Sequence, residues 1–227
     1  MEKISVVILS GGNSSRMGTP KAYLKIGERY FADHLATQLS QADEILFSVG
    51  RKEDYPDISL RHIEDIFPGS GPMAGIHSSL KAARNPLVFV TACDTPFISW
   101  ETVMVLLSHY HEGADMVLPV DQGGRYQMTC ALYHRRLIPL LEDMLKKGDL
   151  RLSHILKSCS HVDVPVTSFG RYEKAFANIN SQEEYRRFLH DSDHFIHCIF
   201  GDGKNHIHGK NSSGAEEEGD PGSCGQT

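Results

Sequence analysis

The sequence has no long hydrophobic run and no signal-peptide pattern. Its longest apolar stretches, such as residues 4–9, are far shorter than the roughly 20 residues of a membrane-spanning helix. The N-terminus does not combine a basic region with a long apolar core, as a signal peptide would. We therefore expect a cytoplasmic protein that does not interact with membranes.

Paired cysteines and an excess of positive charge are also missing. The five cysteines form no C-x-x-C motif and are odd in number, which suits free thiols in a reducing compartment. The net charge of −6 argues against general nucleic-acid binding, because such binding depends on many cationic side chains. Any polyanionic ligand must therefore meet a local group of cations.

Short β-branched segments that alternate with helical patterns indicate the fold class. Residues 4–9 are almost continuously apolar, as in a strand that is covered on both faces. Similar segments follow at residues 44–49, 87–91 and 116–120, and helical patterns cover residues 31–39, 75–83 and 100–111. The alternation predicts a three-layer, Rossmann-like α/β fold whose mostly parallel sheet carries helices on both faces. In such sheets, ligands bind beyond the carboxyl ends of the strands.

The C-terminal part divides into helical patterns and a polar tail. Helices are expected at residues 137–147 and 150–156, and a last one begins near Ser181, with acidic residues in its first turn. After about His190 the chain becomes rich in His, Gly and Glu. We expect a domain over residues 1–189 and a disordered tail over residues 190–227. A metal site in this tail is less favoured than an unstructured end, because its histidines match no zinc spacing.

The loop L-S-G-G-N-S-S-R-M-G-T-P-K, residues 9–21, follows the first predicted strand. Gly11 and Gly12 allow backbone N–H groups to approach an anion closely, and Arg16 and Lys21 add positive charge for a triphosphate. A glycine pair alone is more often a simple turn, but its neighbours here favour a phosphate-binding loop. The pattern is neither a Walker A loop nor a dinucleotide fingerprint.

The segment F-V-T-A-C-D-T-P-F places Asp94 directly after a predicted strand. A carboxylate there can ligate Mg²⁺, which neutralises charge on phosphates. The alternative is that Asp94 caps the helix near Trp100. Its neighbour Cys93 is expected to be a small buried side chain.

The segment E-D-I-F-P-G-S-G-P-M-A-G-I contains a glycine-rich turn before a predicted helix. Backbone groups near Gly71 can read the edge of a base, and Asp65 can accept a hydrogen bond from a purine amino group. The alternative is a turn that only begins the helix.

The segment A-N-I-N-S-Q-E-E-Y carries two amides. In an extended segment, Asn178 and Asn180 would point to one side, toward metal or substrate, while Ile179 packs inward. Alternatively, Asn180 or Ser181 caps the following helix.

In this order, these four segments resemble the molybdenum cofactor guanylyltransferase family over residues 4–189. The resemblance implies a nucleotidyltransferase that moves GMP from GTP to the terminal phosphate of molybdopterin, with Mg²⁺ as cofactor. It also implies possible partners among the proteins that synthesise or accept molybdenum cofactor. Residues 124–133 resemble a segment on the pterin side of the cleft. The implied catalytic residues are Arg16, Lys21 and Asp94, with Asp94 as the metal ligand and Asn178 and Asn180 on the substrate or metal side. The implied nucleotide-binding residues are Leu9, Ser10, Gly11, Gly12, Lys21, Asp65, Gly71 and Asp94.

Two departures from that family bear on specificity. Pro20 stands where the guanylyl enzymes usually have aspartate and resembles the related cytidylyltransferases, although G-G and G-P-M-A-G favour guanine. Residues 48–51, S-V-G-R, replace asparagines, so one nucleotide contact is either missing or supplied by backbone. The alternatives are a cytidylyl or sugar-phosphate transferase and a non-catalytic protein that binds and delivers nucleotide or cofactor.

Overall fold

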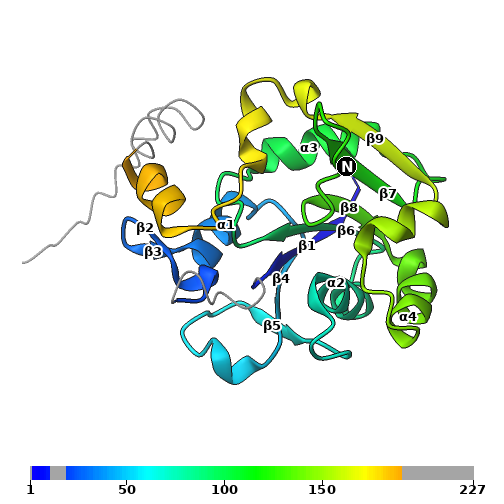
Figure 1. Cartoon of the computed structure of the whole chain (residues 1–227), viewed down its shortest axis with the longest axis horizontal. Coiled ribbons are helices and arrows are strands. Elements are labelled where there is room, and N and C mark those ends of the chain that lie inside the picture. Colours follow the sequence, from blue (N-terminus) through cyan, green and yellow to red (C-terminus); the bar gives the residue numbers. More distant parts are fainter. Residues whose placement is uncertain (1, 11–18, 191–227) are drawn as a thin grey trace, which may run out of the picture.

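A single seven-stranded sheet forms the centre of the molecule (Figure 1). The computed structural model describes residues 2–10 and 19–190. The strand order is β5-β4-β1-β6-β8-β7-β9. Only β8 runs antiparallel to its neighbours among these strands. The strands are β1 (Ile4–Leu9), β4 (Glu44–Val49), β5 (Arg61–Glu64), β6 (Leu87–Ala92), β7 (Met116–Val120), β8 (Ala131–His134) and β9 (His161–Pro165).

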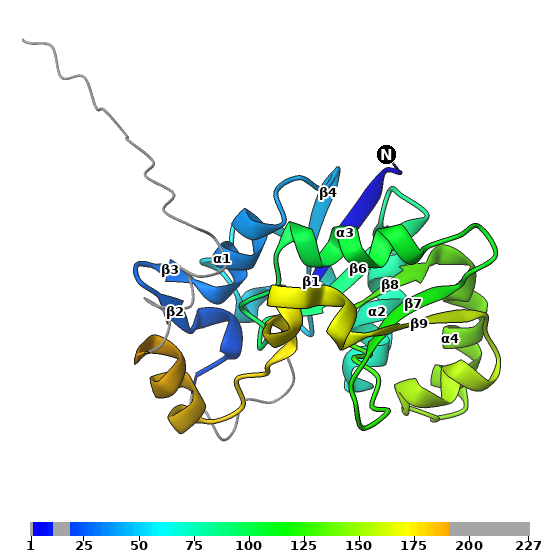
Figure 2. The same cartoon turned by 90° about the horizontal axis from the view of Figure 1, so that it is seen from above.

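Helices cover both faces of this sheet, as predicted. The helices α1 (Phe31–Gln38), α2 (Gly71–Ala82), α3 (Trp100–His109) and α4 (Ile138–Lys146) pack on the sheet. Figures 1 and 2 show α1 and α3 on one side and α2 and α4 on the other. Strand β1 explains why: Val6 and Ile8 face the core under α1 and α3, whereas Val7 and Leu9 face the core under α2 and α4. Within the part of the chain that the structure describes, no helix has the length and apolar character to cross a membrane.

Two sequence predictions need correction. The segment predicted as a helix at residues 150–156 forms only the 3₁₀ helix η4 (Leu152–Lys157). The Asp149 carboxylate binds the His154 side chain inside this segment. The chain then joins β7 at Ser160, whose carbonyl oxygen accepts from the backbone N–H groups of Asp115 and Met116. Helix α2 begins at Gly71, four residues earlier than predicted, because Pro72 is tolerated in a first turn.

The last described segment returns to the N-terminal half of the chain (Figure 2). Residues 182–190 are helical. The Tyr185 hydroxyl accepts from the backbone N–H of Lys25 at 3.1 Å and donates to its carbonyl oxygen at 2.9 Å. Phe188 packs with Phe31 beside the hairpin of β2 (Lys25–Ile26) and β3 (Arg29–Tyr30). The prediction for residues 191–227 lies outside the described residues. The remaining 3₁₀ helices are η1 (Lys21–Tyr23), η2 (Lys52–Asp54), η3 (Arg135–Leu137) and η5 (Val166–Phe176).

A buried carboxylate anchors the start of β4, and we expect its loss to destabilise the fold. The Glu44 side chain is 2% exposed and binds Arg61 at 2.7 Å, Arg84 at 3.0 Å and the Ser5 hydroxyl at 2.8 Å. Burial alone would raise the Glu44 pKa, but hydrogen bonds from Arg84 and Ser5 outweigh it and lower the pKa. Glu44→Ala should cost about 2–3 kcal/mol of unfolding free energy, measured by urea denaturation.

The pH dependence of this stabilisation follows from the direction of the shift. A depressed folded-state pKa means that the contribution is complete above the unfolded value of about 4.5 and is lost as the pH falls through the lower folded value. The exposed Asp54–Arg51 pair provides the control, and Asp54→Ala should leave the urea midpoint almost unchanged. Equal destabilisation by both substitutions would contradict this account.

Candidate active site

The carboxyl ends of β4, β1 and β6 meet at one rim, where hydrogen bonds continue past the strand ends. The backbone N–H of Ser10 donates to the Ser48 carbonyl oxygen at 2.9 Å, and the backbone N–H of Cys93 donates to the Leu9 carbonyl oxygen at 3.0 Å. The backbone N–H of Asp65 donates to Val49 at 3.1 Å. These bonds fix the residues that leave the sheet. Asp94 therefore lies at the rim that the sequence predicts for it, and Leu9 and Asp65 lie at the same rim.

Three polar side chains from distant parts of the chain converge at this rim. The Lys21 ammonium donates to Asp94 Oδ2 at 2.9 Å and to Asn180 Oδ1 at 2.6 Å. The side chains of Lys21 and Asp94 are only 13% and 19% exposed. The backbone N–H of Ile179 also donates to the Asp94 carbonyl oxygen at 2.8 Å. One cation is therefore held between two oxygens from separate segments.

The N-I-N segment has the alternation that the sequence predicts. Ile179 is buried in a small core with Phe31, while Asn178 and Asn180 are exposed. Ser181 is the residue that caps the final helix, because its hydroxyl accepts from the Glu184 N–H at 3.1 Å while Glu184 Oε2 accepts from the Ser181 N–H at 2.9 Å. The Asn180 side chain instead binds Lys21.

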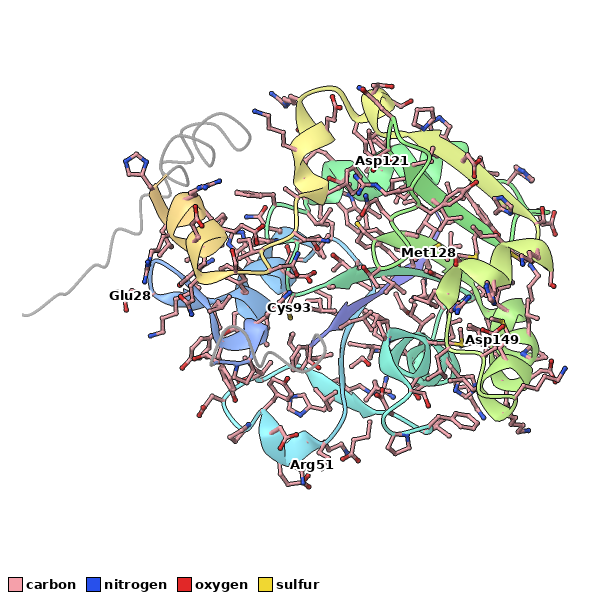
Figure 3. The ribbon with its side chains drawn as sticks, in the orientation of Figure 1. Glu28, Arg51, Cys93, Asp121, Met128 and Asp149 are labelled. Atoms are coloured by element: carbon pink, nitrogen blue, oxygen red, sulfur yellow. The ribbon has the colours of Figure 1, made fainter. Side chains whose placement is uncertain are left out.

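The alternative of Asp94 as a helix cap is wrong. The residue at the N-cap of α3 is Ser99, five positions later. Figure 3 shows the neighbouring Cys93 at the end of β6, in the middle of the molecule. Cys93 is fully buried, and this burial raises its pKa well above the ordinary thiol value. Cys93 is thus a small buried packing residue, as predicted.

Asp65 lies at the other side of the rim, after β5. Burial raises the Asp65 pKa to about 6, and a hydrogen bond from the Ser48 hydroxyl opposes this rise. Its Oδ1 is sealed from solvent and has no hydrogen-bond partner among residues 2–10 and 19–190. Ser48 and Gly75 are not among the predicted site residues, yet a Cβ at Gly75 would lie 2.7 Å from Ser48 Oγ. The close approach of α2 to β4 at Gly75 therefore leaves no room for a side chain there; the one sequence signal near it is that Ser48 replaces a family asparagine.

The glycine-rich turn does begin a helix. Gly71 has a φ of +64°, which favours glycine, and it is the first residue of α2. Of the predicted loop, Gly11, Gly12 and Arg16 lie outside the described residues. Leu9, Ser10 and Lys21 flank that loop at the rim.

A cavity of 510 Å³ lies beside the N-I-N segment. Phe97, Phe176 and Phe188 give it an aromatic wall, and Gln127 and Asn178 are among its polar lining residues. Gln127 belongs to the segment at residues 124–133, which resembles a family segment on the pterin side of the cleft. The aromatic residues were not predicted, because they come from three separate elements.

Comparison with known proteins shows which family this chain belongs to. A family model described as a MobA-like NTP transferase domain matches residues 6–164. A probable molybdenum cofactor guanylyltransferase from Clostridium perfringens (strain SM101 / Type A) is 34% identical over 198 residues, covering 83% of this chain and 98% of the relative. The molybdenum cofactor guanylyltransferase of Aliivibrio fischeri is 31% identical, with coverages of 82% and 96%.

Solved structures show the same fold. Molybdopterin-guanine dinucleotide biosynthesis protein A from Archaeoglobus fulgidus matches with a TM-score of 0.72 at 23% identity, covering 84% of this chain and 99% of that one. The 2-C-methyl-D-erythritol 4-phosphate cytidylyltransferase from Thermus thermophilus matches with a TM-score of 0.60 at 20% identity, with coverages of 82% and 98%.

Proposed function

Since this chain belongs to the MobA-like NTP transferase family, together with the molybdenum cofactor guanylyltransferases, we propose that it transfers GMP from GTP to molybdopterin. The observation that carries the proposal is the Lys21–Asp94–Asn180 cluster at the end of β1 and β6. This cluster combines a cation with two side-chain oxygen atoms beyond the carboxyl ends of the strands, the region where ligands bind in sheets of this type, which supports the proposal. We place the reaction in the cytoplasm, with proteins that make or accept molybdenum cofactor as partners.

The reaction joins two phosphates. An oxygen of the terminal molybdopterin phosphate attacks the α-phosphorus of GTP, a new P–O bond forms, and the bond to the β-phosphate breaks to release pyrophosphate. The nucleophile is already ionised at neutral pH, so no general base is required. Lys21, together with Arg16 from the preceding loop, stabilises the negative charge that develops on the leaving pyrophosphate.

The donor set of the cluster fits Mg²⁺. Among the described residues there is no group of three or more His, Cys, Asp or Glu side chains placed to hold a metal. Mg²⁺ does not need one, because it commonly binds through one or two carboxylates plus substrate phosphates. Asp94 would hold the ion, with Asn180 as a neutral oxygen donor whose Oδ1 already faces a cation. When bound, the ion neutralises charge on the reacting phosphates.

The acceptor fits the cavity next to Asn178. Its volume of 510 Å³ and its mixture of aromatic and polar lining residues suit a flat, polar ring system. Asn178 lines this cavity and is two residues from Asn180, which binds Lys21, and we infer that an acceptor bound there directs its terminal phosphate toward the Lys21 cluster. The predicted nucleotide contacts of Leu9, Ser10, Gly11, Gly12 and Gly71 remain part of this proposal.

A pyrophosphate-release assay tests the proposal. The protein is incubated with Mg²⁺, molybdopterin and each of GTP, CTP, ATP and UTP in turn. We expect release with GTP and formation of the guanine dinucleotide. Preferential release with CTP would replace the proposal with cytidylyl transfer, which Pro20 favours. GTP binding with no release for any acceptor would indicate a delivery protein.

We expect GTP affinity to fall as the pH drops through about 6. Burial raises the pKa of Asp65 to about 6. Above this pH the carboxylate is ionised and can accept two hydrogen bonds from a base, whereas below it one oxygen carries a proton. The dissociation constant of GTP, measured by calorimetry from pH 5 to 8, should rise at the acidic end. Phosphates of GTP titrate in the same range, so Asp65→Asn serves as the reference. The acidic weakening should be larger in the unsubstituted protein, and identical profiles would exclude Asp65 as a base contact.

A further inference from the structure

Glu184, in the first turn of the final helix, accepts one hydrogen bond more than a helix cap requires. Its Oε2 accepts from the Ser181 N–H at 2.9 Å, which together with the Ser181 hydroxyl completes a capping box. The same oxygen accepts from the backbone N–H of Asn180 at 2.7 Å. Asn180 precedes the capping residue, so this second bond fixes the N-I-N segment, including the side chain that binds Lys21.

Hydrogen bonds define the position of Asn180, because the residue is exposed and has little packing to hold it. Its Oδ1 accepts from the Lys21 ammonium at 2.6 Å. On one side, the backbone N–H of Ile179 donates to the Asp94 carbonyl oxygen at 2.8 Å. On the other side, its own N–H donates to Glu184. The Glu184 carboxylate is thus the contact that fixes Asn180 from the side of the helix.

The first turn of the final helix is itself fixed to the chain that follows Lys21. The hydroxyl of Tyr185, the residue after Glu184, bonds to both the N–H and the carbonyl oxygen of Lys25. The Tyr185 ring also packs edge-on against Phe31, with 5.9 Å between the ring centroids. Figure 2 shows this helix beside the β2–β3 hairpin. Glu184 therefore acts from a position that is fixed relative to Lys21.

The Glu184 carboxyl group is also set up to be ionised. The hydrogen bond from the Asn180 N–H is the main cause that lowers the pKa of Glu184, and the Lys21 ammonium lowers it further. An ionised oxygen forms stronger hydrogen bonds to backbone N–H groups than a neutral one does. Glutamine at this position would keep an oxygen acceptor of the same reach without the charge.

Resting on the proposed function, we propose that Glu184 is a positioning residue for nucleotidyl transfer. It holds the Asn180 amide oxygen against the Lys21 ammonium, so that both groups are in place beside Asp94 before the substrates bind. Groups that are arranged in advance need no reorganisation when charge develops on the reacting phosphates. Glu184 acts through Asn180 and not on a substrate.

Steady-state kinetics with GTP, molybdopterin and Mg²⁺ test this role. Glu184→Ala leaves the Asn180 N–H without its acceptor and should lower kcat on the order of tenfold, as is typical for residues that orient a ligand from behind. The KM for molybdopterin should stay within about twofold of the parent value, since no binding contact is removed. Glu184→Gln should restore most of the lost kcat, because a capping box accepts either residue.

The split between kcat and KM excludes a direct contact with the acceptor. Glu184 is one of the residues that line the 510 Å³ cavity, so its side chain could instead bind molybdopterin. In that case Glu184→Ala would raise the KM for molybdopterin and leave kcat unchanged, which would overturn the positioning role. A double-mutant cycle gives a second check. In the Asn180→Ala background, Glu184→Ala should have a much smaller effect on kcat.

Asp149→Ala is the matched control. Asp149 also accepts from a backbone N–H at the start of a short helix, that of Arg151 at 3.4 Å, and it binds His154 at 2.8 Å. Figure 3 shows Asp149 on the opposite side of the molecule from the final helix. Its loss removes a comparable local contact and should leave both kcat and KM unaltered.

A readout that needs no turnover separates this proposal from the proposed function. The side-chain amide signal of Asn180, assigned in NMR spectra of isotope-labelled protein with the Asn180→Ala variant, reports on the contact with Lys21. It should shift in Glu184→Ala and Lys21→Met, and stay near the parent position in Glu184→Gln.

The outcomes are distinct. A parent protein that releases no pyrophosphate with any nucleotide would overturn the proposed function, whereas an unshifted Asn180 signal in Glu184→Ala would overturn the role of Glu184. Active protein in which Glu184→Ala keeps the parent kcat would also overturn that role and leave the proposed function standing. Equal effects of Glu184→Ala in both backgrounds would do the same.

Discussion

Asp94→Asn should lower the rate of pyrophosphate release on the order of a thousandfold, equivalent to roughly 4 kcal/mol of transition-state stabilisation. The substitution keeps the shape of the side chain and an oxygen that can accept from Lys21, but removes its negative charge. The Asp94 carboxylate and the Asn180 amide oxygen both accept from the Lys21 ammonium. Because we assign the metal to the Asp94 carboxylate, we expect the charge that binds the metal to be lost.

The fold should survive the substitution. The backbone N–H of Ile179 donates to the main-chain carbonyl oxygen of residue 94, and this bond does not depend on the side chain. Thermal unfolding should therefore change little. The rate should also require much more Mg²⁺ for half-saturation than in the parent protein.

A matched substitution tests whether the loss of rate comes from the position of Asp94 or from the removal of any acidic side chain. Asp143 pairs with Lys147 at 2.7 Å on α4, and both side chains are more than half exposed. Asp143→Asn makes the same chemical change in an ion pair far from the rim and should leave the rate unaltered. A rate for Asp94→Asn within tenfold of the parent value would contradict the assignment of Asp94 as the metal ligand.

The strand ends could be predicted from sequence because their signals are local. A run such as Ile4–Leu9 needs only its own β-branched, apolar residues to indicate a buried strand. The rule that ligands bind beyond parallel strands then places Asp94 near the loop after β1. Strand β8 was not predicted because it has only four residues. Its antiparallel pairing with β6 and β7 depends on contacts between residues far apart in sequence.

The contacts within the site could not be predicted, because they join residues far apart in sequence. Lys21 and Asn180 are 159 positions apart, and no local pattern indicates that they meet. The same limit applies to Asn180 itself, whose residue type fits both a helix cap and a ligand. The packing of Ile179 and Phe188 against Phe31, together with the backbone hydrogen bond from Ile179 to Asp94, brings Asn180 to Lys21. The approach of Gly75 to Ser48 is likewise a property of how α2 packs on β4.

Lys21→Met should lower kcat/KM for GTP by on the order of a hundred- to a thousandfold. Methionine keeps the aliphatic stem, which matters because the side chain is only 13% exposed, but it removes the ammonium. Because we assign Lys21 to the leaving pyrophosphate, binding of GTP should weaken much more than binding of GMP. Calorimetry with both nucleotides measures this difference.

Lys25→Met provides the control for this second substitution. Lys25 lies four positions downstream, and its ammonium lies over the Tyr30 ring, 5.4 Å from the centroid, away from the cluster. Its loss should leave GTP and GMP affinities unchanged. Equal weakening of GTP and GMP by Lys21→Met would show that the ammonium acts on the whole site and not on the outer phosphates.

The two cluster substitutions should not be additive. The Lys21 ammonium and the Asp94 carboxylate bind each other at 2.9 Å, so either substitution alone leaves its partner without the opposite charge. Residues that act as one unit lose most of their effect with the first change. The double variant should therefore be about as slow as the slower single variant. A loss equal to the product of both single losses would instead show that Lys21 and Asp94 act independently, each on its own phosphate group.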